Sequence, residues 1–346
     1  MRRKASLFAG LGLASLLSLA PIKGIEHIVN NADANVLVVG GGSGEYPTLQ
    51  SAINAAAPSD TVLARDRVFG RSENPLYVEY FPIIIDGNTQ AHGGNLTIMS
   101  EHGRDYTEME NWDGAYILVS IQNVGDGLLL KGFSIDGQFS PSTDSGGLVG
   151  IDIRYASPII SECSIFNSEK TIYGLDSDFT LQDSDVITVY APSGRGVVAS
   201  NYSNPTISRN HFMFGQGTLP SFTYFVEPAI HLATDLTTTP ELNSNIFDGP
   251  PETSLTPALW EAIRVYGPIG FSAENETITP YATEIDFLRT YGTLEEQANY
   301  NCPAITDYHD DPSLGFVDLF GIQTSVESPY STPSSWGGLK TEYKSK

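Results

Sequence analysis

The chain has 346 residues, with 18 Lys and Arg against 41 Asp and Glu, which gives a formal net charge of −23 at pH 7. This balance excludes nucleic acid as a partner, because binding to phosphates depends on Lys and Arg, and it opposes adsorption to anionic membranes. Hydrophobic residues make up 40% of the chain, enough for a folded core, while 33 Gly and 21 Pro favour turns over long helices.

The N-terminal segment has the layout of a secretory signal peptide. Arg2, Arg3 and Lys4 precede an apolar run from Leu7 to Ala20. This run is too short for a comfortable membrane span, and an uncleaved anchor is the alternative. We expect residues 1–20 to be a signal peptide. The mature chain is then a monomer that is secreted or held at the cell surface, in an extracellular or periplasmic location, without insertion into a membrane.

A short amphipathic helix is expected next, at residues 46–56. Leu49, Ile53 and Ala56 fall on one stripe of this helix. A first strand follows at residues 61–64. The helix lies where a solenoid needs a cap over its open core and unpaired strand edges.

The middle of the chain repeats one apolar pattern. Pro158 is followed after two, five and seven residues by Ile160, Cys163 and Ile165, and the same offsets occur after Pro205 and Pro240. Two further segments fit without the proline: Leu128-Leu130-Phe133-Ile135 and Phe179-Leu181-Ser184-Val186. Cys163 therefore falls at a core position, and we expect it to be a buried small residue.

A second alternating strand precedes most copies of this pattern. These strands recur at intervals of about 22 or 33 residues, and their first residues are Gly150, Gly174, Gly196, Ala229 and Ala262. Such a period indicates the coils of a parallel β-solenoid, with longer coils that carry loops at 213–228 and 248–261. A β-sandwich is the alternative, but it would not repeat the same offsets in coil after coil.

The predicted fold is therefore all-β, with a parallel β-helix domain over residues 36–270. Residues 271–346 are acidic and aromatic, and the repeat fades there. We expect this segment to be a C-terminal cap or appendage that contains a helix near 285–297.

Three segments resemble right-handed parallel β-helix proteins of the pectin-lyase-like superfamily. Residues 42–56 (GSGEYPTLQSAINAA), followed by Asp60-Thr61-Val62, are similar to their opening helix and first strand. Asn95-Leu96-Thr97-Ile98 resembles the strand that follows, and residues 310–318 resemble a closing segment of secreted bacterial members. The resemblance implies a right-handed β-helix. It leaves the chemistry open, because the superfamily contains lyases, hydrolases, esterases, epimerases and non-catalytic surface proteins.

Pectin methylesterases, one class in this superfamily, can be compared residue by residue. Gln182-Asp183 and residues 211–215 (HFMFG) lie in the order of two motifs of that class, Q-D and D-F-I-F-G. However, His211 stands where the class has a nucleophilic Asp, and its L-G-R-P-W segment has no counterpart here. We interpret the partial match as a shared strand pattern.

The alternating strands also predict which residues point out of the coils. Counted from each opening residue, the first outward position holds Asp152, Asp176, Val198, His231 and Arg264. The second holds Arg154, Asp178, Ser200, Ala233 and Tyr266. Stacked coils place equivalent residues about 4.8 Å apart. We therefore expect one face to gather the candidate catalytic residues Asp152, Arg154, Asp176, Asp178, His231 and Arg264.

Such a face suits a saccharide, because aromatic rings stack on sugar rings. The candidates for substrate binding are Tyr266 on the face and Phe222, Tyr224, Phe225 and Trp260 from the neighbouring loops. An inverting hydrolase needs two carboxyls roughly 6.5–9.5 Å apart, which Asp152 with Asp176 or Asp178 would provide. A lyase would need a base such as Arg154 or His231.

Ca²⁺ is the one cofactor that the sequence suggests. Asp176, Asp178, Asp183 and Asp185 are the candidate oxygen ligands. Turn formation is the other interpretation of these residues, because Asp bonds readily to its own backbone.

Two functions remain open at this point. The first is a secreted polysaccharide hydrolase or lyase, and the second is a non-catalytic surface or envelope module that binds glycan. A charged strand face also serves simply to keep a solenoid soluble. In either function a neutral glycan fits the acidic chain better than a polyuronate, which would be repelled.

Overall fold

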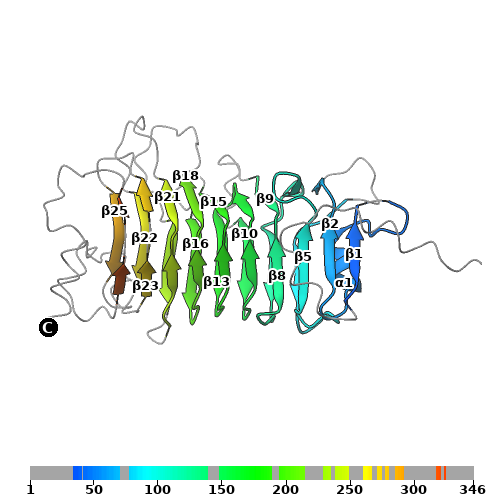
Figure 1. Ribbon diagram of the computed structural model, residues 1–346, viewed down its shortest axis with the longest axis horizontal. Helices are drawn as coiled ribbons and strands as arrows, with labels where there is room; N and C mark the ends of the chain where they lie inside the picture. Colours follow the sequence, from blue (N-terminus) through cyan, green and yellow to red (C-terminus); the bar gives the residue numbers. More distant parts are fainter. Residues whose placement is uncertain are drawn as a thin grey trace, which may run out of the picture. The chain divides into compact units, whose positions relative to one another are not determined.

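Three parallel sheets enclose one apolar core, and successive coils of the chain add successive strands to each sheet (Figure 1). The computed structural model describes residues 34–40, 42–70, 78–138, 148–188, 195–214, 229–234 and 238–248, and the backbone of further strands between 260 and 324. Residues from Asn35 onward belong to one unit. The predicted all-β parallel β-helix is confirmed. The predicted signal peptide lies outside the described residues.

The ten-stranded sheet contains the first strand of the chain, β1. Its strands, in spatial order, are β1 (Val36–Val39), β2 (Thr61–Ala64), β5 (Leu96–Ser100), β8 (Leu128–Lys131), β11 (Ile159–Ser161), β14 (Thr180–Gln182), β17 (Thr206–Ser208), β20 (Glu241–Asn243), β23 (Phe271–Glu274) and β26 (Val317–Phe320).

The nine-stranded sheet follows the ten-stranded sheet along each coil. Its strands are β3 (Arg67–Phe69), β6 (Thr107–Glu110), β9 (Ser134–Asp136), β12 (Ser164–Phe166), β15 (Asp185–Thr188), β18 (His211–Phe214), β21 (Ile246–Asp248), β24 (Thr277–Thr279) and β27 (Gln323–Thr324).

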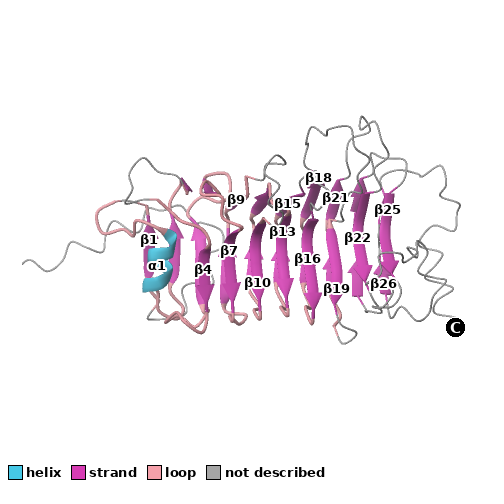
Figure 2. Cartoon of the chain, turned by 180° about the vertical axis from the view of Figure 1, so that it is seen from behind, coloured by secondary structure: helices cyan, strands magenta, loops and turns pink. Residues whose placement is uncertain are grey.

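The eight-stranded sheet completes each coil, and Figure 2 shows its strands in order along the stack. They are β4 (Ile83–Asp86), β7 (Ile117–Gln122), β10 (Val149–Arg154), β13 (Lys170–Leu175), β16 (Arg195–Asn201), β19 (Ile230–Thr234), β22 (Trp260–Tyr266) and β25 (Ile285–Tyr291).

The repeated apolar offsets form the core, as predicted. Ile160 of β11 and Ile165 of β12 are fully buried, and Cys163 at the corner between them is buried too. Burial raises the pKa of the Cys163 thiol to about 11, so the thiol stays neutral inside the coil. These alternating inward side chains bind consecutive coils together through continuous apolar contact.

The same corner carries a row of polar groups inside the core. Ser184 Oγ accepts a hydrogen bond from the Cys163 backbone N at 3.1 Å, and Asn210 Oδ1 accepts one from the Ser184 N at 3.0 Å. Asn245 Oδ1 in turn accepts from the Asn210 N at 3.0 Å. Each side chain thus satisfies a backbone donor of the preceding coil, which a buried corner requires.

The cap helix is α1 (Leu49–Ala55), shorter than the predicted 46–56. Thr48 is its N-cap, and a capping box with Ser51 fixes the first turn. Leu49 and Ile53 are buried against the first coil. Tyr46 precedes the helix and forms a parallel bridge with Val39 instead.

The C-terminal part differs from the sequence-based expectation. The helix predicted near 285–297 is wrong, because residues 285–291 form strand β25, which pairs with β22. Strands of all three sheets continue past residue 270 into the segment expected to be a cap. Among the described residues, no helix has the length and apolar character that crossing a membrane requires.

Candidate functional site

The outer face of the eight-stranded sheet holds one row of aligned residues. Backbone pairing joins β7 to β10, then to β13, β16, β19 and β22, all in parallel. We name the aligned row the outer column: Ser120, Asp152, Tyr173, Val198, His231 and Arg264.

The expectation that Asp176 and Asp178 share this face with Asp152 is wrong. Asp152 pairs with Tyr173, and Arg154 pairs with Leu175. The error came from aligning Gly150 with Gly174. Gly174 is a buried residue where a Cβ would lie 2.5 Å from the Phe179 ring, so this glycine makes room for the core and does not open the strand.

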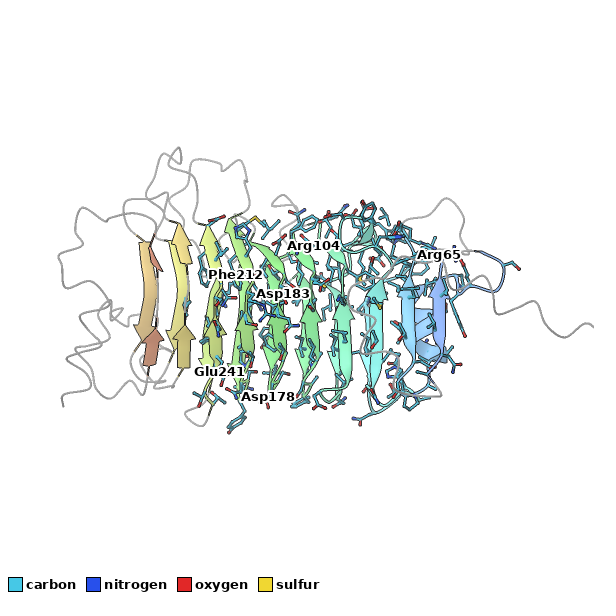
Figure 3. The ribbon with its side chains drawn as sticks, in the orientation of Figure 1. Arg65, Arg104, Asp178, Asp183, Phe212 and Glu241 are labelled. Carbon is cyan, nitrogen blue, oxygen red and sulfur yellow. The ribbon has the colours of Figure 1, made fainter. Side chains whose placement is uncertain are left out.

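Asp176 and Asp178 lie instead at the corner between β13 and β14. Asp176 has a left-handed backbone with φ of 51°, and its Oδ1 accepts from the Tyr202 N at 3.4 Å. Asp178 Oδ1 accepts from the Asn204 N at 3.1 Å. Figure 3 shows Asp178 at the edge of the coils, apart from Asp183. Their role here is to bond one corner to the next, as turn-forming aspartates do.

Asp152 is the most unusual member of the outer column. It points away from the coil interior, between Ile151 and Ile153, and yet it is only 1% exposed. Its Oδ2 accepts from Arg154 Nε at 2.8 Å, while Oδ1 makes no hydrogen bond within the described part of the chain. Burial raises the pKa of this carboxyl, and the Arg154 and Lys170 charges oppose that rise.

Polar and aromatic groups flank Asp152 on both sides. On the preceding coil, Gln122 Nε2 donates to Ser120 Oγ at 2.9 Å. On the following coil, the Tyr173 hydroxyl lies 3.3 Å from Ser200 Oγ, and Lys170 Nζ lies 5.0 Å from the centre of the Tyr173 ring. This part of the face therefore presents a guanidinium and an aromatic ring, with the Asp152 carboxyl buried beside the guanidinium.

The other predicted site residues do not join this group. His231 is buried and lies three strands beyond Asp152, about 14 Å away at normal strand spacing. Arg264 is next to His231 in the backbone register. The side chains of Arg264, Tyr266 and Trp260 lie outside the described residues, as do Phe222, Tyr224 and Phe225.

The four aspartates suggested for Ca²⁺ have separate partners. Asp183 forms an ion pair with Arg209 at 2.7 Å, and Asp185 forms one with Arg104 at 2.8 Å. Asp176 and Asp178 hold backbone amides, as described above. In the described residues, the group of side chains close enough to share an ion is a different one, made of Asp66, Glu101 and His102.

The residues of the partial pectin methylesterase match, Asp183 and His211, contact other side chains and not each other. Asp183 lies at the corner before β15, while His211 lies in β18 opposite Asp185, so the two matched positions are not aligned. His211 Nε2 instead contacts Asp248 Oδ2. The interpretation of a shared strand pattern agrees with this placement.

Sequence reasoning missed Ser120, Lys170 and Tyr173. Tyr173 and Lys170 follow from the register in which Ile151 and Ile172 occupy equivalent inward positions. Ser120 follows from the pairing of Ile151 with Val119 on the preceding coil. Aligning Ile151 with Ile172 would have predicted this register, whereas aligning Gly150 with Gly174 gave the wrong one.

No protein-family model matches this chain, and no curated protein matches its sequence. Solved structures are similar to it. A pectin methylesterase in complex with a hexasaccharide has a TM-score of 0.53 at 11% identity, over 86% of this chain and 92% of its own. The rice weevil pectin methyl esterase has a TM-score of 0.52 at 10% identity, over 86% and 89%. These likenesses show a shared fold, and with the three parallel sheets they identify the chain as a right-handed parallel β-helix.

Proposed function

We propose that this protein contacts extracellular polysaccharide through the outer face of the eight-stranded sheet, as a carbohydrate-active β-helix protein in which Asp152 transfers protons. One observation supports this above the others. Asp152 points outward and is nevertheless buried, with one carboxylate oxygen that has no hydrogen bond in the described structure. A residue kept only for solubility would be exposed, whereas buried, incompletely bonded carboxyls with shifted pKa values are typical of functional sites.

The chemistry of Asp152 follows from its surroundings. Burial raises its pKa, so it keeps its proton to higher pH than an exposed Asp and can act as a general acid there. Arg154 Nε binds Oδ2 and fixes the carboxyl plane. Oδ1 has no hydrogen bond in the described structure, so a sugar hydroxyl or a glycosidic oxygen could bond to it once the groups that cover it move aside. The Tyr173 ring on the neighbouring coil would serve as a stacking surface.

A neutral polysaccharide is the substrate class that we favour. The chain carries a net charge of −23, and Arg154, the cation beside the site, already contacts Asp152. A polyuronate would therefore meet repulsion from most of the protein surface. Secretion or display at the cell surface, as a monomer, is part of the same proposal.

Non-catalytic glycan binding is the second candidate, and a specific observation favours it. Glycoside hydrolysis generally uses two carboxyls. Among the described residues, the outer column offers Asp152 alone, with Ser120, Tyr173, Val198 and His231 at the other positions. The same face would then bind a chain without cleaving it.

Activity and binding should be measured together on the full chain. The substrates are a galactan, a galactomannan, a β-glucan and polygalacturonate, and the readouts are new reducing ends, absorbance of unsaturated products, and retardation in native gels that contain each polymer. We expect retardation and cleavage with a neutral polymer. Asp152→Asn should lower turnover by at least about 100-fold, the scale of a lost acid–base group. Asp126→Asn, an exposed carboxylate in a corner, serves as the matched control.

The outcomes separate the candidates. Retardation without any product, in wild type and Asp152→Asn alike, supports non-catalytic binding and contradicts the acid–base role. The absence of both retardation and product on every polymer contradicts both candidates. Equal turnover in Asp152→Asn and Asp126→Asn would remove Asp152 from the reaction.

A further inference from the structure

Two aromatic side chains stand exposed at the corner between the nine-stranded and eight-stranded sheets. Tyr80 precedes β4 and is 65% exposed, while Trp112 precedes β7 on the next coil and is 36% exposed. Their ring centroids are 5.6 Å apart, with the planes tilted by 53°. The two rings therefore form one continuous aromatic surface that crosses two coils.

Trp112 is held in this position from several sides. Its Nε1 donates a hydrogen bond to the Glu79 carbonyl at 2.9 Å. A Cβ on Gly70 would lie 3.0 Å from Trp112 Cδ1 and 2.5 Å from the Glu110 carbonyl, so the indole occupies space that only glycine leaves open. The Glu79 N donates to the Gly70 carbonyl at 3.1 Å, so the two residues that contact the indole are also bonded to each other. A ring fixed in advance loses little side-chain entropy when a ligand stacks on it.

Acidic residues lie close to the aromatic pair along the chain. Glu108 and Glu110 of β6 lie just before Trp112 in the chain, and Asp113 follows it, with Oδ2 3.3 Å from the Phe81 N. Desolvation and the neighbouring charges of Asp136 and Glu110 raise the pKa of Glu108. Carboxylates accept hydrogen bonds from hydroxyl groups and repel anionic polymers. Aromatic faces with acceptors at their edge match a neutral sugar ring, which has C–H groups on its face and hydroxyls at its rim.

The aromatic pair lies just before two strands of the sheet that carries the proposed polysaccharide face. Of the two strands that leave this corner, β7 lies beside β10 in the eight-stranded sheet, and β4 lies on the other side of β7 (Figure 2). Ser120 of β7 is paired directly with Asp152 of β10. A chain that passes over Asp152 toward the N-terminal end of the coils would reach the corner where Trp112 lies.

We propose that Tyr80 and Trp112 form a saccharide-stacking platform that binds one unit of a neutral polysaccharide and extends the face around Asp152. This rests on the proposed function, since it assumes that the same polymer contacts both places. The platform supplies affinity and position, and Asp152 lies one strand beyond it. The two places together would hold a longer segment of polymer than either would alone.

The test is affinity electrophoresis of the full chain in native gels that contain galactan, galactomannan or β-glucan, with polygalacturonate as the anionic comparison. We expect Trp112→Ala and Tyr80→Ala each to raise the dissociation constant by at least about tenfold, as for a central aromatic anchor. Trp112→Phe keeps a ring but loses the bond to Glu79, and an intermediate effect is expected. Tyr202→Ala, at 62% exposure on a different corner, is the matched control and should bind like wild type.

The outcomes distinguish this inference from the proposal on which it rests. If wild type binds a neutral polymer and both platform variants bind within about twofold of it, the platform is wrong and the Asp152 face stands. If wild type binds none of the polymers, the proposed function itself fails. A change in the oligomeric state of Tyr80→Ala, or binding in wild type that high salt abolishes, would assign the rings to a protein or cationic partner and overturn the inference. Melting temperatures of all variants, compared with wild type, exclude loss of binding through unfolding.

Discussion

Glu79 joins the cap helix to the first coil by both its side chain and its backbone. Its carboxylate accepts hydrogen bonds from the backbone N of Leu49 at 2.6 Å and of Gln50 at 3.2 Å, at the start of α1. Its carbonyl holds Trp112. The side chain is buried, and burial raises its pKa to about 7, although the two amide hydrogen bonds act in the opposite direction.

This raised pKa predicts how stability depends on pH. The ordinary Glu value is 4.5, so between pH 4.5 and about 7 the folded chain holds a proton that the unfolded chain has released. The stabilisation is complete below pH 4.5 and is lost as the pH rises toward 7. We expect the free energy of unfolding to fall across this window, by no more than about 3 kcal/mol from this group. Denaturant titrations at a series of pH values measure it.

Glu79→Gln should flatten that dependence, because an amide does not titrate. Glu241→Gln, an exposed carboxylate, is the control and should keep the wild-type slope. Identical slopes in wild type and Glu79→Gln would mean that another group causes the pH dependence.

At this scale the sequence predicts only part of the site. Strand alternation correctly placed Asp152 and Arg154 on an outer face. Glu79, Tyr80 and Trp112 were missed, because they lie between strands, where no periodicity identifies a neighbour. Their positions depend on contacts such as Trp112 with Glu79, which are 33 residues apart in the chain.

Among the elements, the polar corner between the ten-stranded and nine-stranded sheets depends on buried hydrogen bonds between side chains and backbone. Asn210 is buried there and bonds in two directions, since its Oδ1 accepts from the Ser184 N and its Nδ2 donates to the Leu181 carbonyl. Asn210→Ala would leave both backbone groups buried without partners. We expect a loss of about 2–4 kcal/mol in the free energy of unfolding, measured by chemical denaturation. Asn88→Ala, at an exposed turn, should change it little, and equal effects of the two substitutions would contradict this role.

Elements were predicted well where a pattern is local and poorly where it is ambiguous. The cap helix was expected because of its apolar stripe, and its capping box accounts for the later start at Leu49. The expected helix near 285–297 failed because an apolar spacing of three residues is not unique to helices. In β22 and β25, Trp260 pairs with Ile285 and Ile263 pairs with Leu288, with the same spacing.

In the whole molecule, the fold was easier to predict than the register between coils. Each coil repeats the same inward offsets whatever the length of its loops, so repetition alone reveals the solenoid. The alignment of one coil on the next depends on residues at the corners. The predicted alignment was three residues out, so it placed the Asp176 carboxylate beside Asp152 where the structure has the Tyr173 ring. The prediction of paired carboxyls depended on that shift.

The dispersal of the aspartates also predicts the response to calcium. Asp176 and Asp178 hold backbone amides on the next coil, and Asp183 and Asp185 pair with arginines. We therefore expect added Ca²⁺ to change the melting temperature of wild type no more than that of the double variant Asp176→Ala/Asp178→Ala. A rise with Ca²⁺ in wild type that disappears in the double variant would show that they do bind the ion.

The central claim is that polysaccharide lies on the outer face of the eight-stranded sheet. Hydroxyl-radical footprinting of the full chain, with and without a neutral polymer that retards it in native gels, tests this directly because it reports the exposure of individual aromatic side chains. The account predicts that the polymer lowers the oxidation rates of Tyr173, Tyr80 and Trp112. Tyr155, which follows β10, and Tyr202, which follows β16, should be oxidised at the same rate with and without polymer. Protection of Tyr155 and Tyr202, with Tyr173 unchanged, would contradict it.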